Sequence, residues 1–240
     1  MGESTLLLVP FFVEEPGDEA EFVRRTVEIL REHGFETTYD GCNELIEDYE
    51  ADGARFRNAD ESLEEVAAEL ADASEGTITV WIDDHRIRVG YDFDADTDGE
   101  VEPTLSLSGV NEHFFHGDDV SGETARERAD RIVDAIAALA VETDPWYVGG
   151  WMHPHYGLDP YPDGKPPESG VERLGWIAVF GEAFHDRFGG RQRLLETPAW
   201  NVRDLESGVV LVRRGDLPRF LDCPVDTGLE PSTDDYLFDR

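Results

Sequence analysis

Hydrophobic and polar positions along the chain follow two periodicities, and these predict both strands and helices. Apolar residues alternate with polar or small ones over residues 87–93, which is typical of a half-buried strand. A β-prone apolar run at 77–82 precedes it, and Asp83-Asp84 between the two runs predicts the turn of an antiparallel hairpin. Further strands are expected over residues 6–13, 105–108, 174–180 and 208–213.

Helices are predicted where apolar residues recur at helical spacing. The longest such stretch covers residues 121–141, with Ser121 as the N-cap and Asp144-Pro145 at its end, because a residue before proline avoids the helical region. A shorter helix is expected between Asp18, a capping residue, and Gly34. Strands and helices come in blocks rather than in strict alternation. This order predicts an α+β fold, a mostly antiparallel sheet with helices packed on it.

One stretch interrupts these patterns. Residues 149–171 are rich in glycine, proline, histidine and aromatic side chains, and we expect them to be irregular. Irregular segments of this length are usually functional loops or linkers. We therefore expect an N-terminal α+β portion at 1–148 and a C-terminal portion at 149–240, packed together as one compact unit.

The charge of the chain changes the picture of its partners. The 240 residues contain 55 Asp and Glu against 20 Lys and Arg, a formal net charge of −35, and Lys165 is the single lysine. Nucleic-acid binding is not expected, because a phosphate-binding surface needs clustered basic residues, and an anionic membrane would be repelled. An acidic, almost lysine-free composition is typical of proteins adapted to molar salt, which screens repulsion to within about 3 Å. We therefore expect a halophilic archaeal source and attribute the acidity to the habitat.

The N-terminus and the cysteines point to the cell interior. The apolar run at 6–13 lacks a preceding basic region and is too short to span a bilayer, so we expect a cytoplasmic protein. Cys42 and Cys223 lie far apart and in no metal-binding spacing. They are expected to be buried free thiols, with a single disulfide as the alternative.

Common catalytic signatures are absent from the sequence. It contains no glycine-rich phosphate or dinucleotide loop, no Gly-x-Ser-x-Gly and no His-Glu-x-x-His, so we expect no cofactor. The strongest candidate for chemistry is the segment that contains His153, His155 and Asp159. Two imidazoles and a carboxylate could hold a divalent metal with an open position for water, as in a hydrolase. In the alternative interpretation, these histidines pack within a proline-rich loop.

A second histidine pair brackets two phenylalanines. His113 and His116 flank Phe114 and Phe115, which we expect to be core anchors with polar neighbours. Whether this pair and the pair His153 and His155 converge on one metal is left open by the sequence.

Aromatic residues gather on or beside the irregular stretch. Such side chains can anchor a binding partner, or can fasten a long loop onto its own domain. The residues of this set are Trp146, Tyr147, Trp151, Tyr156 and Tyr161.

Three stretches in the second half of the chain follow a recognisable order. They are Gly175-Trp176-Ile177-Ala178-Val179-Phe180-Gly181, Phe188-Gly189-Gly190 and Leu205-Glu206-Ser207-Gly208-Val209-Val210-Leu211. With them, the chain from about Ala125 onward resembles the immunity proteins of type VI and other polymorphic toxin systems, a family that shows an apolar strand bearing a tryptophan, a helix ending in Gly-Gly, and a last strand introduced by glycine. The resemblance implies an α+β protein without catalysis that binds and blocks a partner toxin. It carries over no active-site residues.

These observations together predict a cytoplasmic binding protein of the toxin-immunity type, which occludes a cognate protein toxin without a metal or cofactor. The residues expected to contact the partner are Trp151, His153, His155, Tyr156 and Tyr161. A metal-dependent hydrolase that uses His153, His155 and Asp159 is the main alternative, and a structural or regulatory subunit is a third. The oligomeric state is left open.

Overall fold

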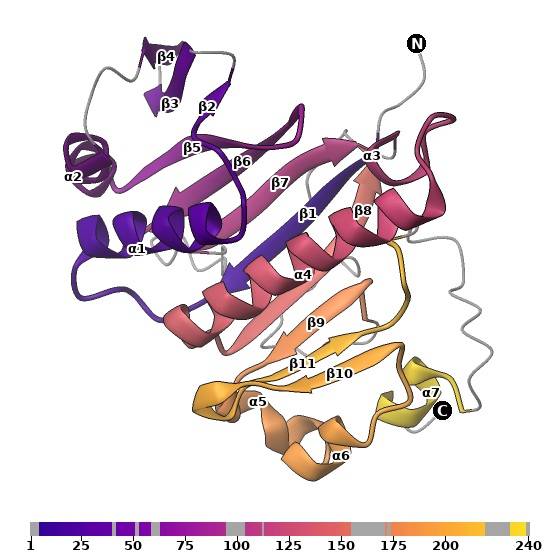
Figure 1. Cartoon of the computed structure of the whole chain (residues 1–240). Coiled ribbons are helices and arrows are strands. Elements are labelled where there is room, and N and C mark those ends of the chain that lie inside the picture. Colours follow the sequence, from indigo (N-terminus) through magenta and orange to yellow (C-terminus); the bar gives the residue numbers. More distant parts are fainter. Residues whose placement is uncertain are drawn as a thin grey trace.

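Strand β1 (Thr5–Phe12) lies at the centre of the sheet in the computed structural model (Figure 1). It pairs antiparallel with β7 (Leu105–Asn111) on one side and with β8 (Tyr147–Pro154) on the other. The structure describes residues 5–39, 42–50, 53–58, 63–94, 104–111, 113–154, 171, 174–218 and 231–238.

Within those residues, eleven strands form one sheet in which every pair is antiparallel. The order is β10-β11-β9-β8-β1-β7-β6-β5-β3-β2, and β4 pairs with β3. The remaining strands are β2 (Thr38–Tyr39), β3 (Cys42–Glu50), β4 (Gly53–Asn58), β5 (Glu75–Ile82), β6 (His85–Asp92), β9 (Ile177–Phe180), β10 (Asn201–Asp204) and β11 (Val210–Arg213). The predicted α+β fold with a mostly antiparallel sheet is confirmed.

Helices cover both faces of this sheet, because β1 is apolar on both. Leu7, Val9 and Phe11 belong to a large core on the face that carries α1 and α4, whereas Phe12 belongs to a second core on the opposite face. The second core includes residues of the short C-terminal helices as well as of β8, β9 and β11. The helices are α1 (Glu19–Glu32), α2 (Leu63–Ala73), α3 (His113–His116), α4 (Gly122–Thr143), α5 (Glu182–His185), η2 (Asp186–Phe188), α6 (Arg191–Leu195), η3 (Glu206–Gly208) and α7 (Thr233–Phe238).

The local signals for helix ends and turns are confirmed. The Ser121 side chain accepts a hydrogen bond from the Thr124 amide at the start of α4, and Asp144 ends that helix in the left-handed conformation. The Asp18 side chain caps α1 by accepting a hydrogen bond from the Glu21 amide. Strands β5 and β6 form the expected hairpin around Asp83-Asp84.

Residues 149–154 differ from the prediction, because they continue β8 instead of forming an irregular segment. Because residues 149 and 150 are glycines, the hydrophobicity pattern of the sequence does not indicate this strand. The structure needs them, since a β-carbon at Gly149 would collide with the Trp151 ring, and one at Gly150 would collide with Ile177 on β9. The expected boundary between 148 and 149 lies inside β8, which pairs with β1 and with β9.

Candidate functional site

The predicted contact residues begin on β8. Trp151 is 4% exposed and belongs to the second core, where its indole lies against the backbone of Gly149 and Gly175. The backbone of His153 is paired with Leu6 of β1. Three further predicted positions, His155, Tyr156 and Tyr161, lie outside the described residues. The structure therefore places Trp151 as a buried anchor at the start of this segment.

The histidine pair of α3 sits at the surface around a buried pair of rings. Phe114 and Phe115 are almost fully buried in the large core, as expected, while His113 and His116 are exposed. The His116 ring lies with Nε2 3.0 Å from the carbonyl oxygen of Pro218. This contact fastens the segment after β11 to α3.

The described residues contain no group of three His, Cys, Asp or Glu side chains arranged to hold a metal. The side chain of His153 and the residues His155 and Asp159 lie outside that part of the chain, so the hydrolase alternative is not tested by this geometry. The same is true of the thiols, because the Cys42 side chain and Cys223 are not described.

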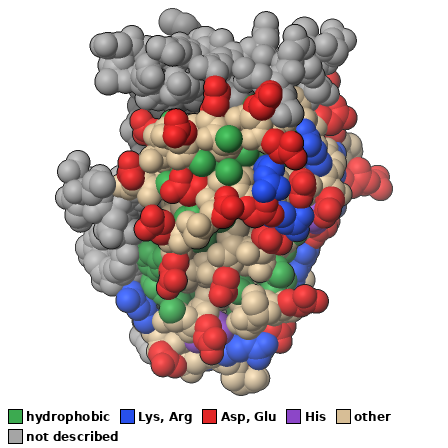
Figure 2. Space-filling model, turned by 90° about the vertical axis from the view of Figure 1, so that its left-hand side faces the viewer, with side chains coloured by type: hydrophobic (Ala, Val, Ile, Leu, Met, Phe, Trp, Pro, Cys, Tyr) green, Lys and Arg blue, Asp and Glu red, His purple; other side chains and the backbone are tan. Residues whose placement is uncertain are grey.

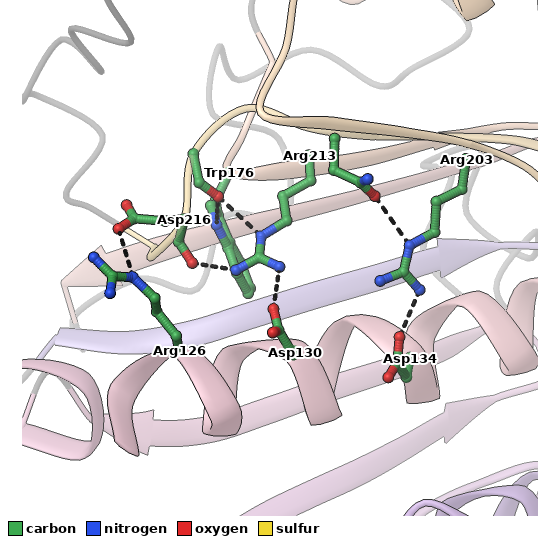
Figure 3. A network of polar contacts seen from close by, with 9 residues as sticks. Arg126, Asp130, Asp134, Trp176, Arg203, Arg213 and Asp216 are labelled. Carbon is green, nitrogen blue, oxygen red and sulfur yellow. Dashed lines mark hydrogen bonds and ion pairs between the residues drawn. The ribbon is translucent and has the colours of Figure 1, made fainter. Parts of the chain in front are cut away.

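A buried arginine joins α4 to the C-terminal strands (Figure 3). Arg213 on β11 is 3% exposed, and its guanidinium lies 5.4 Å from the ring centroid of Trp176. It donates to the carbonyl oxygens of Gly215, at 2.9 Å, and Asp216, and it pairs with Asp130 of α4. The Trp176 indole nitrogen donates to the same Gly215 oxygen at 3.0 Å. These contacts occupy the guanidinium, so Arg213 has a structural role.

A neighbouring contact extends this connection toward the sheet edge. Arg203 on β10 pairs with Asp134 of α4 and donates from Nε to the Asn201 side chain at 3.0 Å (Figure 3). Through Arg213 and Arg203, one helix therefore holds both β11 and β10 in place.

Two arginines from the same part of α4 tie this helix to the β5–β6 hairpin. Arg128 and Arg131 donate to the two carboxylate oxygens of Asp83 at 3.0 and 2.9 Å. Partial burial would raise the pKa of Asp83, but the hydrogen bonds from Arg131 and Arg128 outweigh it and lower this pKa. Arg131 also donates to the carbonyl oxygen of Gly34, which follows α1 in the sequence, at 2.8 Å. Helix α4 thus links the β5–β6 hairpin to strands β10 and β11.

The surface combines dispersed acids with paired arginines. Figure 2 shows acidic side chains spread over one face, with a group of basic side chains toward the right-hand side and others at the lower left and bottom. Arg25 of α1, for example, lies 2.7 Å from Glu28 and 3.2 Å from Glu142. Such arginines are neutralised by their neighbours.

One exposed aromatic residue lies outside the predicted set of contact residues. Trp200 is 59% exposed and is the exposed large hydrophobic side chain of the described residues. It immediately precedes β10, which lies at one edge of the sheet. A tryptophan beside other apolar residues normally predicts a core position. The one sequence signal for a surface turn here is Pro198, two positions before Trp200.

Comparison with known proteins gives a likeness of fold. No protein family matches the sequence, and no curated protein does so either. Over 98% of its length the chain superposes on 70% of a Pseudomonas aeruginosa T6SS protein, PA0821, with a TM-score of 0.57 and 10% identity. The chain shares its fold with a T6SS protein. At this identity, the likeness concerns the fold alone.

The structure adds one observation on membranes. None of the helices in the described residues combines the length and the apolar character that a bilayer span requires.

Proposed function

We propose that this chain is a non-catalytic binding protein of the toxin-immunity type, which neutralises a cognate protein toxin by occluding it in the cytoplasm of a halophilic archaeon. The observation that carries the proposal is the fold shared with a T6SS protein over 98% of the chain. The C-terminal motifs that resemble type VI immunity proteins, among them the Trp176 strand and Gly189-Gly190, support it independently of that superposition.

The contacts are proposed to come from the segment that starts on β8. Trp151 supports this proposal, because its burial against Gly149 and Gly175 anchors the start of the segment in the second core. His153, His155, Tyr156 and Tyr161 follow it in sequence and are the proposed contact residues. Aromatic side chains carry large contact area at small entropic cost, which suits a rigid blocking surface.

The mode of binding follows from the charge. With a net charge of −35, long-range attraction would favour a basic toxin at low salt. Molar salt reduces the range of that attraction to about 3 Å. Shape complementarity and apolar burial therefore have to supply most of the affinity, and no metal or cofactor takes part.

The test begins with the genes on either side of this one. The adjacent toxin gene is expressed in a haloarchaeal host with and without this chain, and growth is followed. A catalytically inactive form of the same toxin is then titrated with the purified chain in molar KCl by calorimetry. We expect restored growth and a stoichiometric complex.

Three results would contradict the proposal. These are continued toxicity without a complex, the absence of any toxin gene beside this one, and stoichiometric zinc or manganese in the purified chain. The last result would favour hydrolysis at His153, His155 and Asp159.

A further inference from the structure

Strand β10, at one end of the sheet, is paired on a single side in the described part of the chain, and an exposed aromatic ring stands directly before it. We infer that the edge of β10, together with Trp200, is a docking surface for an extended segment of a protein partner that carries no net negative charge. The inference rests on the proposed function and adds a second contact surface for the toxin, besides the segment that starts on β8.

The backbone of β10 is paired on one side in the described part of the chain. Its residues pair with β11 in the register Asn201–Arg213 to Asp204–Val210, and β10 stands at the end of the strand order. Just beyond β10, the Leu205 amide donates to the Val209 carbonyl oxygen at 2.9 Å. In an antiparallel ladder, hydrogen-bonded pairs alternate with non-hydrogen-bonded pairs.

This alternation identifies the open groups. Counting back from Leu205, the residues bonded to β11 are Arg203 and Asn201. The amide and carbonyl groups of Val202 and Asp204 are therefore directed to the outer edge. An extended segment of a partner could pair with these four groups as an added strand.

Trp200 makes this edge different from strand edges that are protected against pairing with another chain. Exposed strands are normally guarded by charges and by short length, and large apolar side chains are kept away from them. Here an indole that is 59% exposed stands directly before the strand. Tryptophan is among the residues most enriched at the energetic centres of protein interfaces.

The charges of β10 are already satisfied within the molecule. Arg203 pairs with Asp134 of α4, and Asp204 pairs with Arg191 of α6. Both ion pairs are formed within the chain, so the strand itself adds no net charge to the edge. The rest of the chain carries a large negative excess. Molar salt screens this charge beyond about 3 Å, so it acts only between side chains in direct contact, where it favours a neutral or basic segment over a second acidic copy.

The edge is also held rigidly before binding. Every residue of β11 is buried, and Arg213 fixes its end to α4 and to Trp176. A rigid template loses little conformational entropy when a partner strand is added.

Four variants test the inference against the inactive toxin described above, in molar KCl. Trp200→Ala removes the ring and Trp200→Phe retains an aromatic surface. Val202→Pro removes the outward-facing amide N–H without breaking a hydrogen bond to β11, and edge strands tolerate proline at such positions. Val202→Ala is its control, because it also removes the valine side chain but keeps the amide N–H. Thermal unfolding establishes that each variant is folded.

We expect Trp200→Ala to weaken binding by about thirty-fold, as for a tryptophan at the centre of an interface, and Trp200→Phe to recover part of the loss. Val202→Pro is expected to weaken binding by about tenfold, and Val202→Ala by less than about threefold. Hydrogen exchange at the amides of Val202 and Asp204 is expected to slow when the toxin is bound.

The outcomes separate this inference from the proposed function. If the wild-type chain and all four folded variants bind equally well, the edge is not the docking surface, and toxin binding stands. If the wild-type chain does not bind, both proposals fall. A dimer of the wild-type chain that dissociates in Trp200→Ala would assign the edge to a second copy and overturn the inference.

Discussion

Trp151 packs against the backbone of Gly175 so closely that a β-carbon at Gly175 would lie 2.7 Å from the indole nitrogen. Gly175 stands just before β9, and Trp151 lies on the neighbouring strand β8. The glycine therefore allows these two parts of the chain to approach each other. This contact joins the predicted partner-binding segment to the second core.

The first prediction concerns this contact. Gly175→Ala is expected to lower the free energy of unfolding by about 2–3 kcal/mol, because the added methyl group meets both the indole and the backbone of Gly150. Gly122→Ala is the control, since nothing lies within 4 Å of a β-carbon there, and a change of less than about 1 kcal/mol is expected. Urea unfolding of both variants measures the difference, and equal stabilities would disprove the close packing.

The second prediction separates folding from binding in the segment that starts on β8. Trp151→Ala is expected to cost about 3–5 kcal/mol of stability, because the indole is buried. Trp151→Phe keeps an aromatic ring and is expected to be much milder. Tyr156→Ala and Tyr161→Ala are expected to reduce toxin affinity with little change in melting temperature. Unchanged affinity in both folded tyrosine variants would remove this segment from the binding mechanism.

The third prediction tests the arginine on β11. Arg213→Lys is expected to destabilise the protein by about 2 kcal/mol, because lysine cannot reproduce the planar fork that serves Gly215, Asp216 and Asp130. Asp130→Asn is expected to cost less than about 1 kcal/mol, since Asp130 is largely exposed. Denaturant titrations of the two variants compare the costs. If Asp130→Asn is the more costly, the ion pair outweighs the backbone contacts.

The fourth prediction concerns pH and Asp83. Its pKa is lowered in the folded state, so its interaction with Arg128 and Arg131 stabilises the fold above the unfolded pKa of about 3.9 and is lost as the pH falls through the folded pKa. Asp83→Asn is expected to cost about 1 kcal/mol at pH 7, a small value because Asp83 is more than a third exposed.

The corresponding measurement is the difference in unfolding free energy between the wild type and Asp83→Asn across the pH range. We expect the difference to be constant above about pH 5 and to shrink below about pH 4. A difference that grows as the pH falls would have the wrong sign for a lowered carboxyl pKa.

Local patterns predicted much of the fold. The alternation over residues 87–93 corresponds to β6, and the helical spacing over 121–141 corresponds to α4 with its cap at Ser121. Phe114 and Phe115 were correctly expected in the core. These features depend on neighbours within a few positions in the chain, which is why the sequence reveals them.

The candidate surfaces were harder to predict. Because of Gly149 and Gly150, the hydrophobicity pattern did not indicate β8. Arg213 is buried although arginine is usually exposed, and Trp200 is exposed although tryptophan is usually buried. No local pattern distinguishes these residues, because their burial depends on which distant strands become neighbours.

The sequence by itself determined the α+β class, the ends of the main helices, the β5–β6 hairpin and the strongly acidic character, since each follows from composition or from short-range periodicity. Only the tertiary structure decided that Arg213 is buried over Trp176, that Trp151 anchors β8, and that Trp200 stands exposed beside β10, the end strand of the sheet in the described residues. The reason is physical. Antiparallel pairing brings β9 between β8 and β11 and leaves β10 at the end of the sheet, and this order of strands assigns each side chain to the core or to solvent.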